Sequence, residues 1–96
     1  MTLRKVVQMF AAQMEQKLRE NKHKGGWESE GDFYLLKRLR EEVDELAGVV
    51  NEPMCAERNA RIAREAADVA NFAMMIAHNA EGLKEEPHGK EARRQP

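Results

Sequence analysis

Cysteine, proline and aromatic residues are scarce in this chain, and their scarcity excludes several classes of protein. The 96 residues include one cysteine, three prolines and 5% aromatic residues. A single cysteine, Cys55, forms no intramolecular disulfide, which argues against a disulfide-stabilised secreted domain. No apolar run approaches the ~20 residues that span a bilayer, and a formal net charge of −1 lacks the basic excess of nucleic-acid binders. We therefore expect a soluble, cytoplasmic, single-domain protein that contacts neither a membrane nor a nucleic-acid polymer.

What the chain does contain is helical periodicity. Apolar residues recur at three- and four-residue steps over residues 3–21, 33–50 and 54–80, which predicts three α-helices. Asp32 is the expected N-cap of the second helix. Residues 1–82 are thus predicted to form an all-α domain. Residues 83–96 are charged, contain two prolines and show no periodicity, so we expect a disordered tail.

Four acidic residues form two pairs with the same spacing, one pair on each of the last two predicted helices. Residues three apart lie on the same helix face. The pairs are Glu42 with Glu45, and Glu65 with Asp68.

A helical projection places one acid of each pair inside an apolar stripe and the other on its flank. Glu42 and Glu65 fall inside their stripes, whereas Glu45 and Asp68 lie at the edges. Glu41 points away. The apolar positions that define the two stripes are Leu35, Leu36, Leu39, Val43, Leu46 and Val50 on the second helix, and Ile62, Val69, Phe72, Ala73 and Ile76 on the third.

Acids in an apolar stripe need a compensating positive charge. Removing an ionised carboxylate from water costs several kcal/mol unless it is paired or bound to a cation. A divalent cation held by carboxylate oxygens meets this need. The competing explanation is a set of salt bridges to nearby arginines, for which the candidates are Arg38, Arg58, Arg61 and Arg64.

The third predicted helix is apolar on more than one side. A helix that is apolar around most of its circumference must be buried on most of it. We therefore predict a helical bundle of three main helices that is completed by homo-oligomerisation, as a homodimer or a dimer of dimers. Alternatively, the first helix covers this second face. Its members are Ala60, Ala63, Ala67, Ala70, Met74 and Ala77.

Together these motifs resemble a known family. Residues 41–45 (EEVDE) and 65–68 (EAAD) are similar to the EExxE…ExxD signature of the MazG-like all-α nucleoside triphosphate pyrophosphohydrolases. Residues 24–27 (KGGW) and 67–72 (ADVANF) also resemble small single-domain members, including those carried by phages. The resemblance extends over roughly residues 10–80.

The resemblance implies a metal-dependent reaction. Members of this family are helical bundles that bind Mg²⁺, for which Mn²⁺ can substitute, and cleave nucleoside triphosphates to the monophosphate and pyrophosphate. Carried over by position, the metal ligands are Glu42, Glu45, Glu65 and Asp68. Glu45 or a neighbouring carboxylate is the expected general base. The implied role is house-cleaning of the nucleotide pool.

Substrate contacts are less defined by the motifs. We predict Lys24 as a phosphate-binding residue, with a solvated lysine as the alternative. Trp27 is predicted either to stack on a base or to anchor its loop on the bundle. Asn71 is a candidate for a hydrogen bond to the nucleotide or to a second subunit, and His78 is expected on the solvent side.

Two other classes of protein are alternatives to a pyrophosphohydrolase. Ferritin-like di-iron proteins require Glu-x-x-His on paired helices, and no histidine stands three residues after Glu42 or Glu65. A non-enzymatic helical homodimer that acts as an interaction module would use its acids only in pairs with arginine.

Overall fold

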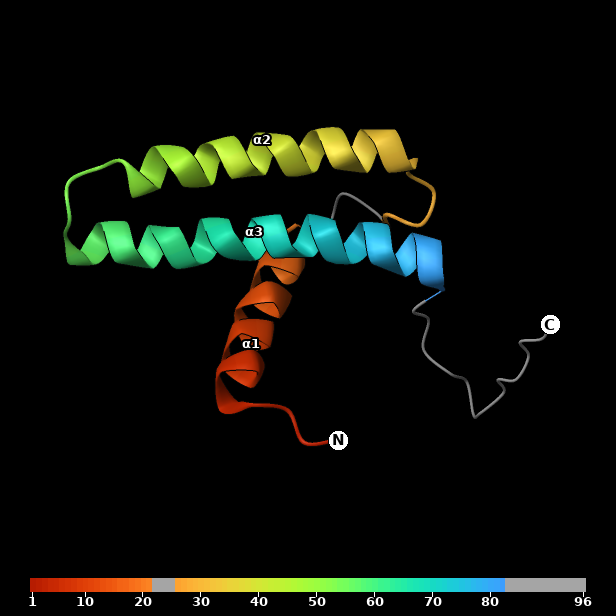
Figure 1. The fold of residues 1–96 in the computed structure, drawn as a ribbon, viewed down its shortest axis with the longest axis horizontal. Coiled ribbons are helices and arrows are strands. Elements are labelled where there is room, and N and C mark those ends of the chain that lie inside the picture. The colour runs from red at the N-terminus through yellow and green to blue at the C-terminus, as the bar shows by residue number, and fades with distance from the viewer. Residues whose placement is uncertain (22–25, 83–96) are drawn as a thin grey trace.

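The computed structural model describes residues 1–21 and 26–82, and within these ranges α-helix is the only regular secondary structure (Figure 1). Its helices are α1 (Lys5–Glu20), α2 (Asp32–Val50) and α3 (Ala56–Glu81), and the described residues contain no strand. The prediction of an all-α fold with three helices is confirmed, and each helix ends within two residues of its predicted bounds. The predicted tail, 83–96, and Lys24 lie outside the described residues.

Local sequence signals account for most of the helix ends. Gly82 follows α3 with a φ of 66°, a left-handed conformation that glycine adopts without a steric penalty. At the start of α3, the Cys55 thiol accepts a hydrogen bond from the Arg58 backbone N–H at 3.4 Å. The prediction for α2 was wrong by one residue, because Asp32 is the first helical residue and Gly31 occupies the N-cap.

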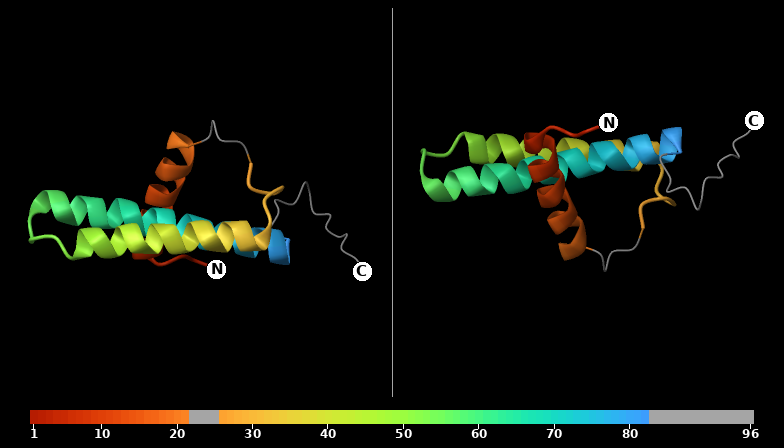
Figure 2. Two further views of the ribbon diagram at one scale, coloured as in Figure 1. Left: turned by 90° about the horizontal axis from the view of Figure 1, so that it is seen from above. Right: turned by 90° about the horizontal axis from the view of Figure 1, so that it is seen from below.

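Helices α2 and α3 form an antiparallel hairpin, and both views in Figure 2 show them side by side. The residues of α2 that this contact buries are Leu35, Glu42 and Val49, which recur every seven residues. A seven-residue repeat is the narrow seam that one helix presents to a single neighbour. The predicted stripe was wider than this seam. Val43 and Val50, expected inside it, are each 45% exposed.

Helix α1 crosses α3 steeply and projects away from the hairpin (Figures 1 and 2). It packs on α3, and no residue of α1 is fully buried. Asn71 of α3 donates a hydrogen bond from Nδ2 to the Met14 carbonyl oxygen at 3.0 Å. The N-terminal half of α1 leaves apolar side chains exposed, including Val6 (67%) and Met9 (60%).

The second apolar face of α3 is covered in part within the chain itself. Ala67 is fully buried, and Asn71, one turn further on, contacts α1. The expectation that Ala67 faces a second subunit was therefore wrong, because Ala67 is already buried within the single chain. The contact of Asn71 with α1 agrees with the alternative that the first helix covers part of this face.

No helix in the described ranges combines the length and the apolar character needed to cross a bilayer.

Candidate metal centre

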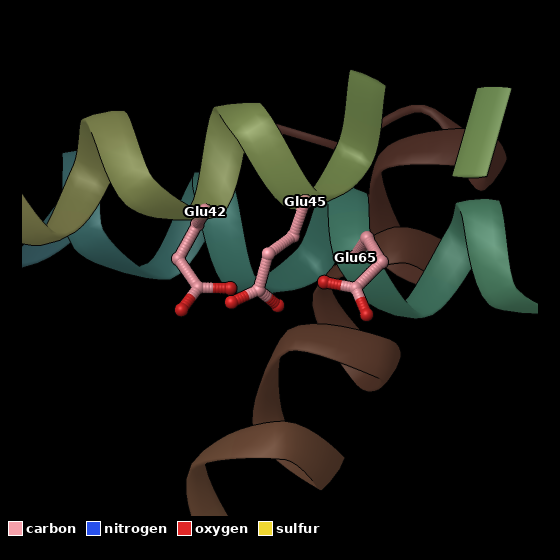
Figure 3. Close-up of side chains that lie close together, drawn as sticks. All are labelled: Glu42, Glu45 and Glu65. Carbon is pink, nitrogen blue, oxygen red and sulfur yellow. The ribbon is translucent and has the colours of Figure 1, made fainter. Parts of the chain in front are cut away.

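The acids of both pairs line one pocket where the three helices meet. Glu42 and Glu45 descend from α2, and Glu65 approaches from α3, so that the three carboxylates lie next to one another (Figure 3). One carboxylate oxygen from each of these three residues lies within 4.8 Å of the others. Asp68 lines the same pocket one helical turn after Glu65. The structure thus brings all four predicted metal ligands together.

Burial separates the two acids of α2 in the way that the helical projection predicted. Glu42, inside the apolar stripe, is only 7% exposed, whereas Glu45, on the flank of α2, is exposed. On α3, Glu65 is half-buried and the Asp68 side chain is 19% exposed, so the predicted difference in depth is not seen there. The projection therefore identified the face of all four carboxylates, but the depth of the α2 pair alone.

Two cations border this acidic group. Arg38 donates from Nη2 to Glu42 Oε2 at 3.2 Å, and its guanidinium lies 4.9 Å from the centre of the Phe72 ring. On the opposite side, Lys17 Nζ lies 3.4 Å from Asp68 Oδ2. Neither Glu45 nor Glu65 forms an ion pair within the described residues. With all groups ionised, four carboxylates and two cations leave this pocket with a net charge of −2.

Salt bridges to arginine were the competing explanation for the four acids, and they compensate only Glu42. Arg38 pairs with Glu42. The other three candidate arginines bind elsewhere: Arg58 to the Val50 carbonyl oxygen, Arg61 to Glu52, and Arg64 to Glu20.

The pocket raises the pKa values of its two most enclosed glutamates. Burial raises the pKa of Glu42, and the nearby charges of Glu45 and Asp68 raise it further, although Arg38 opposes them. Burial and the charges of Glu45 and Asp68 likewise raise the pKa of Glu65. Two unit charges 4.8 Å apart repel by ~3.5 kcal/mol at an effective dielectric of about 20. Either bound protons or a bound divalent cation relieves this repulsion.

Two buried oxygen atoms at the pocket, Glu65 Oε1 and Asn71 Oδ1, have no hydrogen-bond partner in the part of the chain that the structure describes. Asn71 is only 3% exposed. Buried polar oxygens are normally satisfied, so unpaired ones need an explanation such as a bound ion or water. The pocket has a volume of about 300 Å³ and is lined by Lys17, Leu18, Asn21, Arg38, Glu42, Glu45, Glu65, Asp68, Asn71, Phe72 and Met75.

Of the two predicted substrate-binding residues that the structure describes, Asn71 lines this pocket and Trp27 does not, while Lys24 lies outside the described residues. Trp27 instead donates from Nε1 to His78 Nδ1 at 2.8 Å, and Asn79 Nδ2 donates to the Trp27 carbonyl oxygen at 3.1 Å. These bonds attach the segment before α2 to the C-terminal end of α3, as the loop-anchor interpretation of Trp27 predicted. The expectation that His78 faces solvent was wrong, because its ring is half-buried against Trp27.

Glu41, the first acid of the signature, stays outside the cluster. Its carboxylate pairs with Arg38 and with Lys37, and the hydrogen bond from Arg38 lowers the pKa of Glu41. Its outward projection was predicted from the helical spacing.

Sequence reasoning missed Lys17. The residue lies at three-residue spacing from Met14, on the face of α1 that contacts α3. This spacing was visible in the sequence, but nothing local indicated which acid the lysine would meet 51 residues later.

Comparisons with known proteins gave no match to a protein-family model, to a curated protein or to a solved structure.

Proposed function

We propose that the pocket binds Mg²⁺ and that the protein is a nucleoside triphosphate pyrophosphohydrolase. The observation that supports this most directly is the charge balance of the site. Four carboxylates from two helices converge on one pocket that contains two cations, and the residual charge of −2 equals the charge that one divalent ion neutralises.

The donor set fits a hard divalent cation. Carboxylate oxygens are the ligands that Mg²⁺ prefers, and its Mg–O distance of about 2.1 Å allows two ligand oxygens to be at most about 4.2 Å apart. The oxygens of Glu42, Glu45 and Glu65 lie within 4.8 Å, so the widest pair needs to close by about 0.6 Å. Small rotations of these glutamate side chains would supply such a movement.

The proposed reaction is the one that the motif resemblance implies, and the pocket residues would support it. When bound, the cation would neutralise phosphate charge and polarise the phosphorus that is attacked. A water molecule adds to the α phosphorus, the bond from that phosphorus to the bridging oxygen breaks, and pyrophosphate leaves. Glu45, the exposed member of the cluster, accepts the proton of the water. Asn71 lines the pocket wall and is the proposed substrate contact there.

The direct test measures pyrophosphate released from a panel of NTPs and dNTPs in the presence of Mg²⁺ or Mn²⁺. We expect release that depends on the metal and disappears in Glu65→Gln. Asp44→Asn is the matched control, because Asp44 is an exposed acid of α2 outside the pocket. Equal activity of Glu65→Gln and the wild type would refute the site.

We propose further that the protein is a homodimer or a dimer of dimers, joined through α1 rather than through the alanines of α3. The exposed apolar side chains of α1 border a groove of about 340 Å³, lined by Val6, Val7, Phe10, Ala11 and Met14. Burying such a surface against a second copy of this chain would stabilise both copies.

A second candidate function is that of a non-enzymatic helical homodimer, which the same exposed face of α1 favours. Addition of Mg²⁺ separates the two. An enzyme with the proposed site melts at a higher temperature with Mg²⁺, since a ligand that binds only the folded state stabilises it. An interaction module does not.

A further inference from the structure

Lys17 is the basic residue that α1 contributes to the lining of the acidic pocket. Its side chain is only 15% exposed, and Nζ lies 3.4 Å from Asp68 Oδ2 and 3.5 Å from Glu20 Oε1. Glu20 is already bound by two nitrogens of Arg64, at 3.0 and 3.3 Å. Asp68 is therefore the main partner of Lys17, and Lys17 is the cation that compensates Asp68.

The two cations of the pocket differ in how firmly they are held. Arg38 binds both Glu41 and Glu42, and it also lies over the Phe72 ring. Arg38 would remain paired with Glu41 even if Glu42 bound a metal ion. Lys17 also faces two carboxylates, Asp68 and Glu20, and Glu20 is shared with Arg64 as Glu41 is shared with Lys37. The difference between the two cations is therefore the contact of Arg38 with the Phe72 ring.

We infer that Lys17 exchanges partners when the site is loaded, binding Asp68 in the metal-free protein and a phosphate oxygen of the substrate once a divalent cation has taken Asp68. This inference rests on the proposed function. The cation and the lysine ammonium compete for the same carboxylate and repel each other. The triphosphate then supplies the negative charge that the displaced ammonium requires, and a lysine serves phosphate as a compact, mobile point charge.

Lys17→Met tests this exchange, because methionine keeps an unbranched apolar stem and removes the charge. Arg19→Met is the control, since Arg19 lies on the same helix in an exposed pair with Glu15. We would measure binding of Mn²⁺ alone by electron paramagnetic resonance. We would also measure binding of an NTP analogue with a non-hydrolysable α,β-methylene bridge at saturating Mn²⁺.

Opposite effects on the two ligands are expected. Removing a competing partly exposed ion pair should tighten Mn²⁺ binding by roughly 3- to 10-fold. Losing a charge-assisted bond to phosphate should weaken binding of the analogue by roughly 10-fold or more. Lys17→Arg should restore much of the analogue affinity, and Arg19→Met should match the wild type in both measurements. A lysine that merely fastens α1 to α3 would not produce opposite signs.

Several outcomes would overturn the inference. If Lys17→Met binds both ligands as the wild type does, or binds both more weakly, Lys17 does not exchange partners. If it does not fold, as judged by circular dichroism, Lys17→Gln takes its place under the same criteria. Failure of Lys17→Met to change either affinity, while the wild type binds Mn²⁺ and releases pyrophosphate, refutes this inference alone. A wild type that binds no Mn²⁺ refutes both this inference and the proposed function.

Discussion

Replacing Glu42 by glutamine should stabilise the metal-free protein while it destroys the response to metal. The amide keeps the shape of the side chain, so the seam between α2 and α3 stays packed. What changes is the charge of a group that is only 7% exposed and stands beside other carboxylates.

The size of the effect follows from two opposing contributions. Repulsion between unit charges at 4.8 Å ranges from ~0.9 kcal/mol at the dielectric of water to ~3.5 kcal/mol at an effective dielectric of about 20. Against this, Glu42→Gln weakens the ion pair with Arg38, worth about 1 kcal/mol. Because two neighbouring glutamates are relieved, we expect a net gain of about 1 to 2 kcal/mol, which raises the melting temperature by about 4 °C or more.

The assay is thermal unfolding followed by circular dichroism, without metal and with millimolar Mg²⁺, at a fixed protein concentration. The wild type should gain about 2.7 kcal/mol when Mg²⁺ is present at 100 times its dissociation constant, and Glu42→Gln should gain far less. Asp44→Asn should behave as the wild type in both conditions. A variant that melts lower than the wild type without metal, and that responds equally to Mg²⁺, would refute the argument that uncompensated charge dominates this pocket.

Three further predictions use the same protein. The pKa values of Glu42 and Glu65 are raised on folding, so the folded state takes up protons at a higher pH than the unfolded state, and metal-free stability should rise as the pH falls from 7 towards about 5. A pH series of melting curves checks this, and the rise should shrink with Mg²⁺. Trp27→Phe removes the hydrogen bond to His78 and should lower the free energy of unfolding by about 1 kcal/mol without changing the maximal rate of pyrophosphate release; an equally large loss of rate would point to a substrate contact instead. Val6→Glu, at a position 67% exposed, should dissociate the proposed dimer in sedimentation velocity with unchanged helix content, whereas Ala67→Glu, at a fully buried position, should unfold the chain itself.

Helical periodicity was sufficient to place the acids, because their positions depend on local geometry. Glu42 sits between Leu39 and Leu46 at spacings that fix one helix face, and the structure buries it there. The width of the apolar seam was not predictable in the same way. The width of the seam depends on how many helices pack against α2. Among the described helices α2 packs against α3 alone, so Val49 is buried while Val43 is exposed.

Contacts between residues far apart in the sequence were also not predicted. The hydrogen bond from Trp27 to His78 joins residues 51 positions apart, as does the ion pair from Lys17 to Asp68. Neither partner has a local signal, because a tryptophan or lysine suits many environments. The same reasoning explains Ala67: the sequence shows that the face is apolar, but only the docking of α1 determines what covers it.

The attachment of α1 links the pocket to assembly. Among the described residues, three polar interactions hold α1 on α3, and all of them lie in the C-terminal half of α1: Asn71 with Met14, Lys17 with Asp68, and Glu20 with Arg64. Asn71 and Asp68 are also pocket residues. A cation that takes Asp68 would therefore weaken one of these three attachments, while apolar side chains in the N-terminal half of α1 are exposed in the described part of the chain. In the proposed dimer the partner would hold that half in place. Dilution below the dimer dissociation constant should then lower the specific activity, and Val6→Glu should lower it at every concentration. A dissociated Val6→Glu monomer with full activity would show that α1 keeps its position without a partner.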